Sequence, residues 1–224
     1  MKIVAAKKIL NANQQLAETN RAGLDAARVL GVNVVGSPGC GKTTLLEALF
    51  SALRGRLAPA VIEGDIAGSI DAERIDALGV PVVQINTEGA CHLDANMIAT
   101  ASQGLDLDRA DLLVIENVGN LVCTAGFDLG EHLRIVVLSV SEGDDKLAKY
   151  PAIFRGSHAL VITKLDLLPH TNFNVQRAVD DMKRLAPEAR VFQVSALRGD
   201  GIPALADWLV EQHAARPVRQ VGGR

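Results

Sequence analysis

The stretch Gly36-Ser37-Pro38-Gly39-Cys40-Gly41-Lys42-Thr43 decides the fold of this chain. It fits the pattern G-x-x-x-x-G-K-[ST] at every fixed position. The mostly apolar residues 32–35 before it predict a buried strand, and residues 44–50 after it predict a helix. Between a strand and a helix, the backbone N–H groups of such a loop and the helix N-terminus are oriented to bind phosphate. The stretch therefore predicts the phosphate-binding loop of a nucleotide-binding protein.

The side chains of this loop have separate predicted roles. Lys42 is expected to reach the β- and γ-phosphates, and the Thr43 hydroxyl is expected to bind Mg²⁺. Cys40 is expected to fill the space of a serine rather than to bind a metal. The residues predicted to contact the nucleotide here are Gly36, Gly39, Cys40, Gly41, Lys42, Thr43 and Thr44.

Strands and helices alternate along the rest of the sequence. Further apolar runs predict strands at 61–65, 82–86, 112–116, 135–140, 159–163 and 190–194, with helices at 71–78, 92–102, 172–185 and 202–213. This alternation predicts an α/β fold with a mostly parallel sheet covered by helices on both faces. We expect an N-terminal helical segment at 1–30, a nucleotide-hydrolysing domain at 31–213 and a flexible tail at 214–224.

The composition narrows the class of protein. Hydrophobic residues make up 48% of the 224 residues but aromatic residues only 3%, which predicts the aliphatic core of a parallel sheet. The net charge of −3 gives no sign of nucleic-acid binding, and no apolar run is long enough for a membrane span. The three cysteines have no disulfide spacing, which predicts reduced thiols in the cytoplasm.

Two predicted strand ends indicate which base is bound. The Asp166 carboxylate can accept hydrogen bonds from N1–H and the exocyclic amine of guanine, and adenine lacks that amine. The Lys164 stem can cover the base plane, and the turn 195–197 can offer a backbone N–H to O6. We therefore expect GTP, although Thr163 stands where the usual guanine-reading motif has Asn. The predicted base-contacting residues are Lys164, Asp166, Ser195, Ala196 and Leu197.

Asp65 and Glu116 end predicted strands beside the phosphate-binding loop. The carboxyl ends of parallel strands line the ligand crevice, so either acid can hold Mg²⁺ directly or through water. We expect Asp65 to be the leading Mg²⁺ ligand, and Glu116 to act in a γ-phosphate switch or to position the attacking water. Lys42, Asp65 and Glu116 are the predicted catalytic residues. Each acid could instead be a plain helix cap.

Cys91, His92 and Cys123 follow the third and fourth predicted strands and can meet near Glu116. Thiolates with an imidazole suit Zn²⁺, or Ni²⁺ in planar geometry. Neighbours on a regular helix point about 100° apart, so Cys91 and His92 can share an ion only from an irregular turn. A free cysteine is commonly just a buried small apolar residue, so the residues alone leave both readings open.

Longer motifs resemble HypB, a family of GTPases that help to insert nickel into hydrogenases. They include Glu63-Gly64-Asp65, Cys91-His92 and Asn120-Leu121-Val122-Cys123, and the resemblance extends over residues 9–213. It implies a SIMIBI-like P-loop GTPase that hydrolyses GTP with Mg²⁺ and forms a GTP-dependent homodimer. It also implies an interfacial Ni²⁺ or Zn²⁺ site made by Cys91, His92 and Cys123. The implied partners are other hydrogenase maturation proteins, including a nickel-binding one, and the hydrogenase large-subunit precursor.

Some positions depart from that family. Thr124 follows Cys123 where Pro is usual, Asn96 stands where some members have another His, and the Cys-rich and His-rich storage segments of some members are not seen. One alternative is a urease-type nickel GTPase, but its usual Cys-Pro-His is absent. Another is a ParA/MinD-like ATPase, which has a second lysine where this chain has Ser37. The third is a GTP switch that needs no metal.

Overall fold

The computed structural model describes residues 4–66 and 68–216, with the side chains of the first helix described from residue 11 onward. The strands are β1 (Leu30–Gly36), β2 (Pro59–Asp65), β3 (Val82–Asn86), β4 (Leu112–Glu116), β5 (Leu133–Ser139), β6 (Ala159–Thr163) and β7 (Arg190–Gln193). The α-helices are α1 (Val4–Ala27), α2 (Lys42–Leu53), α3 (Ile70–Asp76), α4 (Ala95–Ser102), α5 (Lys146–Lys149), α6 (Pro151–Arg155), α7 (Val175–Leu185) and α8 (Ile202–Ala214). Three short 3₁₀ helices are η1 (Leu107–Arg109), η2 (Cys123–Gly126) and η3 (Leu165–His170).

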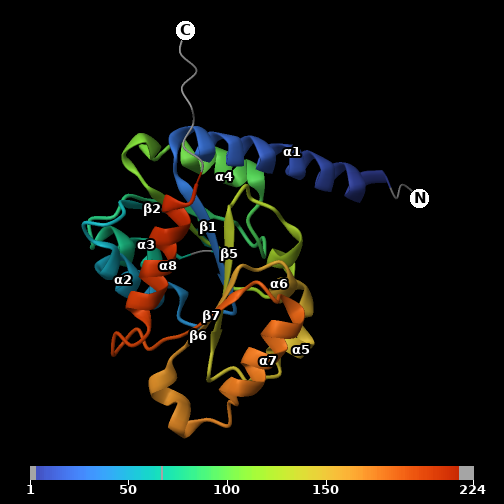
Figure 1. Ribbon diagram of the computed structural model, residues 1–224. Helices are drawn as coiled ribbons and strands as arrows, with labels where there is room; N and C mark the ends of the chain where they lie inside the picture. Colours follow the sequence, from blue (N-terminus) through green and yellow to red (C-terminus); the bar gives the residue numbers. More distant parts are fainter. Residues whose placement is uncertain (1–3, 67, 217–224) are drawn as a thin grey trace.

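The strands form one sheet in the order β3-β2-β4-β1-β5-β6-β7, and every neighbouring pair is parallel. Helices α2, α3 and α8 pack on one face, and α1, α4, α5, α6 and α7 pack on the other (Figure 1). The central strand β1 is buried at every residue because both faces are covered. The predicted α/β fold is confirmed, with a sheet that is parallel throughout its described strands.

The parallel arrangement brings separate parts of the sequence to one edge. Strands β1, β2, β4 and β6 all end there, so the phosphate-binding loop lies beside the residues that follow the other three strands. The register pairs Val34 with Glu116, and Glu63 of β2 with Glu116 of β4. This edge is where the predicted functional residues converge.

The element boundaries differ from the sequence predictions in a few places. The helix predicted from residue 92 begins only at Ala95, because the Asp94 carboxylate caps it by accepting a hydrogen bond from the Met97 N–H at 2.8 Å. Cys91 and His92 therefore lie on an irregular turn, as a shared ion would require. Helices α5 and α6 were not predicted. Helix α8 continues to Ala214, and residues 217–224 of the predicted tail lie outside the described residues.

Helix α1 is held to the domain by the buried side chains of Ala17 and Leu24 and by polar contacts. The Asn20 amide donates to the Ala95 carbonyl at 2.8 Å and to the Leu129 carbonyl at 3.0 Å. The Arg21 guanidinium binds both oxygens of Asp128, at 2.7 and 2.8 Å. Bidentate pairs of this kind fix orientation as well as contributing energy. The N-terminal helical segment thus packs on the domain beside α4.

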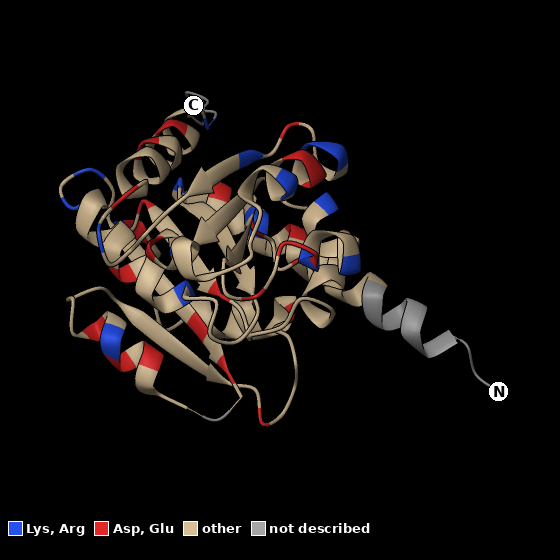
Figure 2. Cartoon of the chain, turned by 90° about the horizontal axis from the view of Figure 1, so that it is seen from below, with Lys and Arg blue, Asp and Glu red and all other residues tan. Residues whose placement is uncertain are grey.

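Charged residues show no segregation in the described part of the chain. In the cartoon of Figure 2, basic and acidic positions are interspersed along the described helices and loops. Within residues 4–66 and 68–216, no helix has both the length and the apolar character needed to cross a bilayer.

Gly130 offers a test of how α1 packs. Its φ is 93°, and a Cβ there would lie 2.6 Å from the Ala17 carbonyl oxygen and from the Asn20 Cβ. We expect Gly130→Ala to lower the free energy of unfolding by roughly 2–4 kcal/mol through conformational strain and the clash together. Gly79→Ala is the control, because φ is 75° there but no atom lies within 4 Å of a Cβ. It should cost only about 1–2 kcal/mol. Equal urea midpoints for the two variants would contradict the predicted clash.

Candidate functional site

The phosphate-binding loop runs from the end of β1 to the start of α2. Gly36 must lack a side chain, because a Cβ would lie 2.6 Å from the Cys40 Sγ and 2.7 Å from the Val137 carbonyl oxygen. Gly41 has φ 94° and directly precedes α2. Cys40 is fully buried, and burial raises the pKa of its thiol to about 11. It therefore fills space in the loop and is a poor metal ligand.

Glu116 contacts the loop at its two functional side chains. The Thr43 hydroxyl donates to Glu116 Oε1 at 2.9 Å, and the Lys42 ammonium lies 4.0 Å from the same oxygen. Glu116 is only 2% exposed. Burial raises the pKa of its carboxyl to about 7, while Lys42 and Thr43 oppose that rise. The acid at the end of β4 is thus placed where a Mg²⁺ ion or attacking water would meet the phosphates.

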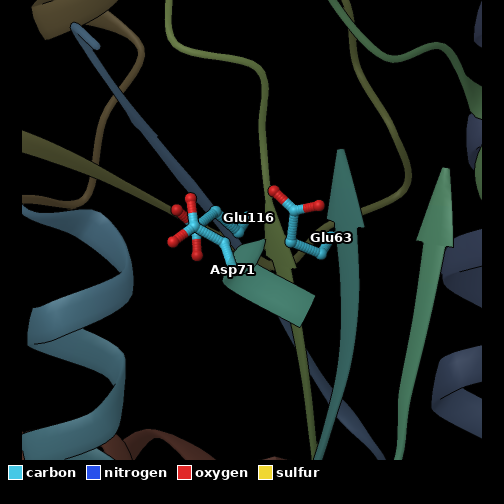
Figure 3. A group of neighbouring side chains, drawn as sticks. All are labelled: Glu63, Asp71 and Glu116. Atoms are coloured by element: carbon cyan, nitrogen blue, oxygen red, sulfur yellow. The ribbon is translucent and has the colours of Figure 1, made fainter. Parts of the chain in front are cut away.

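Two more acids join Glu116 in a carboxylate cluster (Figure 3). Glu63 of β2 and Asp71 of α3 each bring an oxygen so that the three groups lie within 4.8 Å of one another. Among the described residues, the buried Oε2 atoms of Glu63 and Glu116 have no hydrogen-bond partner. Burial and the neighbouring Glu116 raise the pKa of Glu63 to about 8. Orphaned carboxylate oxygens beside a threonine hydroxyl are a donor set that fits Mg²⁺.

Asp65, the predicted leading Mg²⁺ ligand, is placed differently. Its carboxylate accepts from the backbone N–H groups of Ile66 at 2.6 Å and Gly68 at 3.0 Å, in the loop that follows β2. Sequence reasoning did not select Glu63 or Asp71. The sequence position of Glu63 could have indicated a functional role, because an acid inside an otherwise apolar strand needs a partner for its carboxylate. Asp71 looked like an ordinary residue of the first turn of a helix.

Two residues at the end of β6, Thr163 and the predicted base-covering Lys164, hydrogen-bond to the phosphate-binding loop. The Thr163 hydroxyl donates to the Cys40 carbonyl at 2.7 Å, so threonine braces the loop where Asn is usual. The Lys164 ammonium donates to the Gly39 carbonyl at 2.6 Å. The Ser195 hydroxyl donates to Asp166 Oδ1 at 2.6 Å and lowers the pKa of that carboxyl.

The remaining members of the predicted nucleotide set lie around them. Leu197 is 84% exposed beyond Ser195 and Ala196. The Thr44 hydroxyl accepts a hydrogen bond from Arg74 of α3 at 3.0 Å. That contact joins the start of α2 to the helix that carries Asp71.

Cys91 has both His92 and Cys123 as neighbours, but the ligand atoms of the three do not all lie within 4.8 Å of one another in the described part of the chain. The Cys91 Sγ lies 3.7 Å from the His92 Nδ1, and a hydrogen bond to the Cys123 thiol is the first cause of the raised pKa of Cys91. The His92 ring stacks on Phe127, with the ring centroids 3.8 Å apart. Two thiols and an imidazole on partly exposed loops can bind a soft or borderline metal ion.

Residues 116–123, here called the switch loop, connect this cluster to the phosphate-binding loop. A Cβ on Gly119 would lie 2.9 Å from the Pro38 nitrogen, and the Asn120 N–H donates to the Gly36 carbonyl at 2.9 Å. The Asn120 side chain accepts from the Cys123 N–H at 3.1 Å. The hydroxyl of Thr124, which stands where the family has Pro, donates to the Asn120 carbonyl at 2.7 Å.

Comparison with known proteins agrees with this geometry. The family model "CobW/HypB/UreG, nucleotide-binding domain" matches residues 30–193. Hydrogenase maturation factor HypB of Escherichia coli (strain K12) is 46% identical over 207 residues, which cover 92% of this chain and 71% of that protein. Probable HypB of Methanocaldococcus jannaschii is 42% identical over 204 residues, covering 91% and 92% of the two chains.

Solved structures give the same result. HypB from Helicobacter pylori in complex with nickel has a TM-score of 0.87 and 39% identity, covering 91% of this chain and 95% of that chain. The signal recognition particle receptor FtsY from Elizabethkingia anophelis has a TM-score of 0.52 at 18% identity, covering 80% and 66%. That second likeness shows the fold alone, and it agrees with the predicted α/β fold. The chain belongs to the HypB hydrogenase maturation factors of the CobW/HypB/UreG nucleotide-binding family.

Proposed function

We propose that this chain is a cytoplasmic, GTP-hydrolysing metallochaperone that binds nickel and assists its insertion into a [NiFe]-hydrogenase precursor. One observation carries the proposal: the switch loop contacts the phosphate-binding loop at Glu116 and Gly119 and ends at Cys123, whose thiol neighbours that of Cys91. The relative from Helicobacter pylori is described as being in complex with nickel. We therefore assign Ni²⁺ as the cargo, with Zn²⁺ as a second ion of the same ligand chemistry.

Hydrolysis relies on positioning and charge. The backbone of the loop and Lys42 bind the phosphates, and Glu116 orients the attacking water or follows the γ-phosphate. When Mg²⁺ is bound, it neutralises phosphate charge. We assign its protein ligands to Thr43 and to the carboxylates of Glu63, Asp71 and Glu116, because these carry the orphaned or converging oxygens. In this proposal Asp65 shapes the loop after β2 instead of leading the metal set.

Cargo binding uses the two thiolates and the imidazole. A thiol must lose its proton to bind, so nickel binding should release protons and weaken as the pH falls. The chain by itself places Cys91 next to His92 and near Cys123. A GTP-dependent homodimer would therefore place two such sets of ligands near one two-fold axis, where a nickel-binding maturation partner and the precursor would receive the ion.

The base assignment rests on Asp166. Asp166→Asn replaces an acceptor with a donor against the guanine amine, so GTP should bind roughly 2–5 kcal/mol more weakly and xanthosine triphosphate should bind better. Equilibrium titration with both nucleotides is the measurement. Asp180→Asn, on the exposed side of α7, is the matched control and should bind GTP like the parent. Unchanged GTP affinity in Asp166→Asn would rule out the guanine assignment.

The Mg²⁺ assignment can be tested by comparing Asp71, a proposed ligand, with Asp65. Asp71→Asn should raise the Mg²⁺ concentration needed for half-maximal GTP hydrolysis by roughly 10–100-fold, because a metal-facing carboxylate is lost. Asp76→Asn removes an exposed acid from the same helix and should leave that concentration unchanged. If Asp65→Asn has the larger effect instead, Asp65 is the ligand and Asp71 is not.

The cargo assignment is tested by nickel titration. The GTP-bound and GDP-bound forms should differ in Ni²⁺ affinity by about 1–3 kcal/mol, the usual range of coupling energies. Cys123→Ala should lose both nickel binding and the difference, because it removes the thiol at the end of the switch loop. Normal nickel binding by Cys123→Ala, or equal affinities in the parent's two forms, would leave a GTPase without a chaperone mechanism.

A further inference from the structure

A buried asparagine lies in the middle of the central strand. Asn33 is fully buried in β1, whose other residues are glycines and aliphatic residues. An amide buried without partners would be destabilising. This one is satisfied by side chains from two distant parts of the sequence. Its Nδ2 donates to Glu131 Oε1 at 3.1 Å, and its Oδ1 accepts from Asn117 Nδ2 at 3.2 Å.

The contact with Asn117 connects Asn33 to the switch loop and to Cys91 and His92. These two residues are one half of what we call the thiol–imidazole cluster, and Cys123 is the other half. Asn117 directly follows Glu116 and is 2% exposed. Its Oδ1 accepts from the N–H of Leu93 at 3.3 Å and from the N–H of Val118 at 3.0 Å. Leu93 directly follows Cys91 and His92, so one side chain bonds both to the backbone beside these two residues and to the backbone of the switch.

The contact with Glu131 connects Asn33 to the segment beside Cys123, the other half of the thiol–imidazole cluster. Glu131 Oε1 also accepts from Arg134, at 3.0 Å from Nε and 2.7 Å from Nη2. Arg134 donates to the carbonyls of Ala125 at 3.3 Å and Phe127 at 2.9 Å. These carbonyls belong to the segment directly after Cys123, and the Phe127 ring stacks on His92.

A continuous hydrogen-bonded path therefore starts and ends at the two halves of the thiol–imidazole cluster. It runs from the Leu93 N–H through Asn117, Asn33, Glu131 and Arg134 to the carbonyls of Ala125 and Phe127. All four of its side chains are buried, with exposures between 0% and 9%. A bond broken inside such a path leaves a buried polar group unsatisfied, so the path should shift as a unit.

We propose that Asn33 and Asn117 are positioning residues that make the separation of Cys91 and His92 from Cys123 depend on the nucleotide. Glu116 bonds to Thr43, so a displacement of Glu116 on nucleotide exchange displaces Asn117 with it. The hydrogen-bonded path then shifts the backbone at Leu93 relative to the backbone at Phe127. This inference rests on the proposed function, because it specifies how nucleotide and cargo are coupled.

Asn33→Leu tests the path, since leucine is of similar size and removes both amide links. Asn33 touches none of the proposed nickel or nucleotide ligands through its amide, so Asn33→Leu should bind GTP and GDP like the parent. The ratio of Ni²⁺ affinities in the two forms should fall from the parent's value of about 5–150-fold toward unity. The nickel–thiolate absorption bands should also lose their dependence on the nucleotide. Met182→Ala creates a cavity in α7 away from the path and should keep the parent's ratio and spectra.

Asn117→Asp is the second variant and covers the case in which Asn33→Leu does not fold. Aspartate still accepts from Leu93 and Val118 but cannot donate to Asn33, so the ratio should fall here too. A nickel-free readout is the rate at which a thiol reagent modifies Cys91 and Cys123, which should differ between GTP and GDP in the parent and converge in both variants.

The outcomes separate the two proposals. A folded Asn33→Leu or Asn117→Asp protein that keeps the parent's affinity ratio and thiol reactivities would overturn the inference and leave the proposed function intact. A parent whose Ni²⁺ affinity is the same with GTP and with GDP would overturn the proposed function, and the inference with it.

Discussion

The hydrogen bond between Thr43 and Glu116 is the contact on which the rest of this molecule depends. It joins the start of α2 to the end of β4, and it can form only because β1 and β4 are adjacent and parallel, with Val34 in register with Glu116. Everything that follows Glu116, including Gly119 against Pro38 and the Cys123 thiol, takes its position from that register. In a close-packed interior such neighbours cannot shift independently, so a change at the phosphates must be accommodated along the switch loop.

Much of this could be predicted from the sequence. The phosphate-binding loop has an unambiguous pattern, and the strand ends place Glu116, Asp166, Cys91 and Cys123 at one edge before any coordinates are known. The limits are equally physical. Which of Asp65 and Asp71 is turned toward the carboxylate cluster depends on how the loop after β2 folds. In this loop the Asp65 carboxylate accepts hydrogen bonds from the nearby backbone N–H groups of Ile66 and Gly68. The start of α4 depends on whether Asp94 or an earlier residue is its cap, and pattern alone does not decide that.

The buried polar side chains were the part least accessible to sequence reasoning. Asn33 interrupts an apolar strand by a single residue, and its partners Asn117 and Glu131 are far away in the sequence. Their hydrogen bonds become apparent only in three dimensions. Such networks contribute little net stability compared with an apolar core, and their best-attested role is to specify one arrangement among several. Here they surround the thiol–imidazole cluster on both sides, which is where a defined arrangement would matter most.

The carboxylate cluster has a further consequence for the ligand-free protein. Burial raises the pKa values of Glu63 to about 8 and of Glu116 to about 7, well above those of an unfolded chain, and neighbouring carboxylates add to the rise. The folded form therefore holds protons that the unfolded form has released, and folding stability falls as the pH rises from about 4.5 through these values, by on the order of a few kcal/mol. In the proposed function, a Mg²⁺ ion bound with the nucleotide would take the place of those protons. The ligand-free protein therefore carries an electrostatic penalty at this edge at neutral pH, and the proposed ion would offset it.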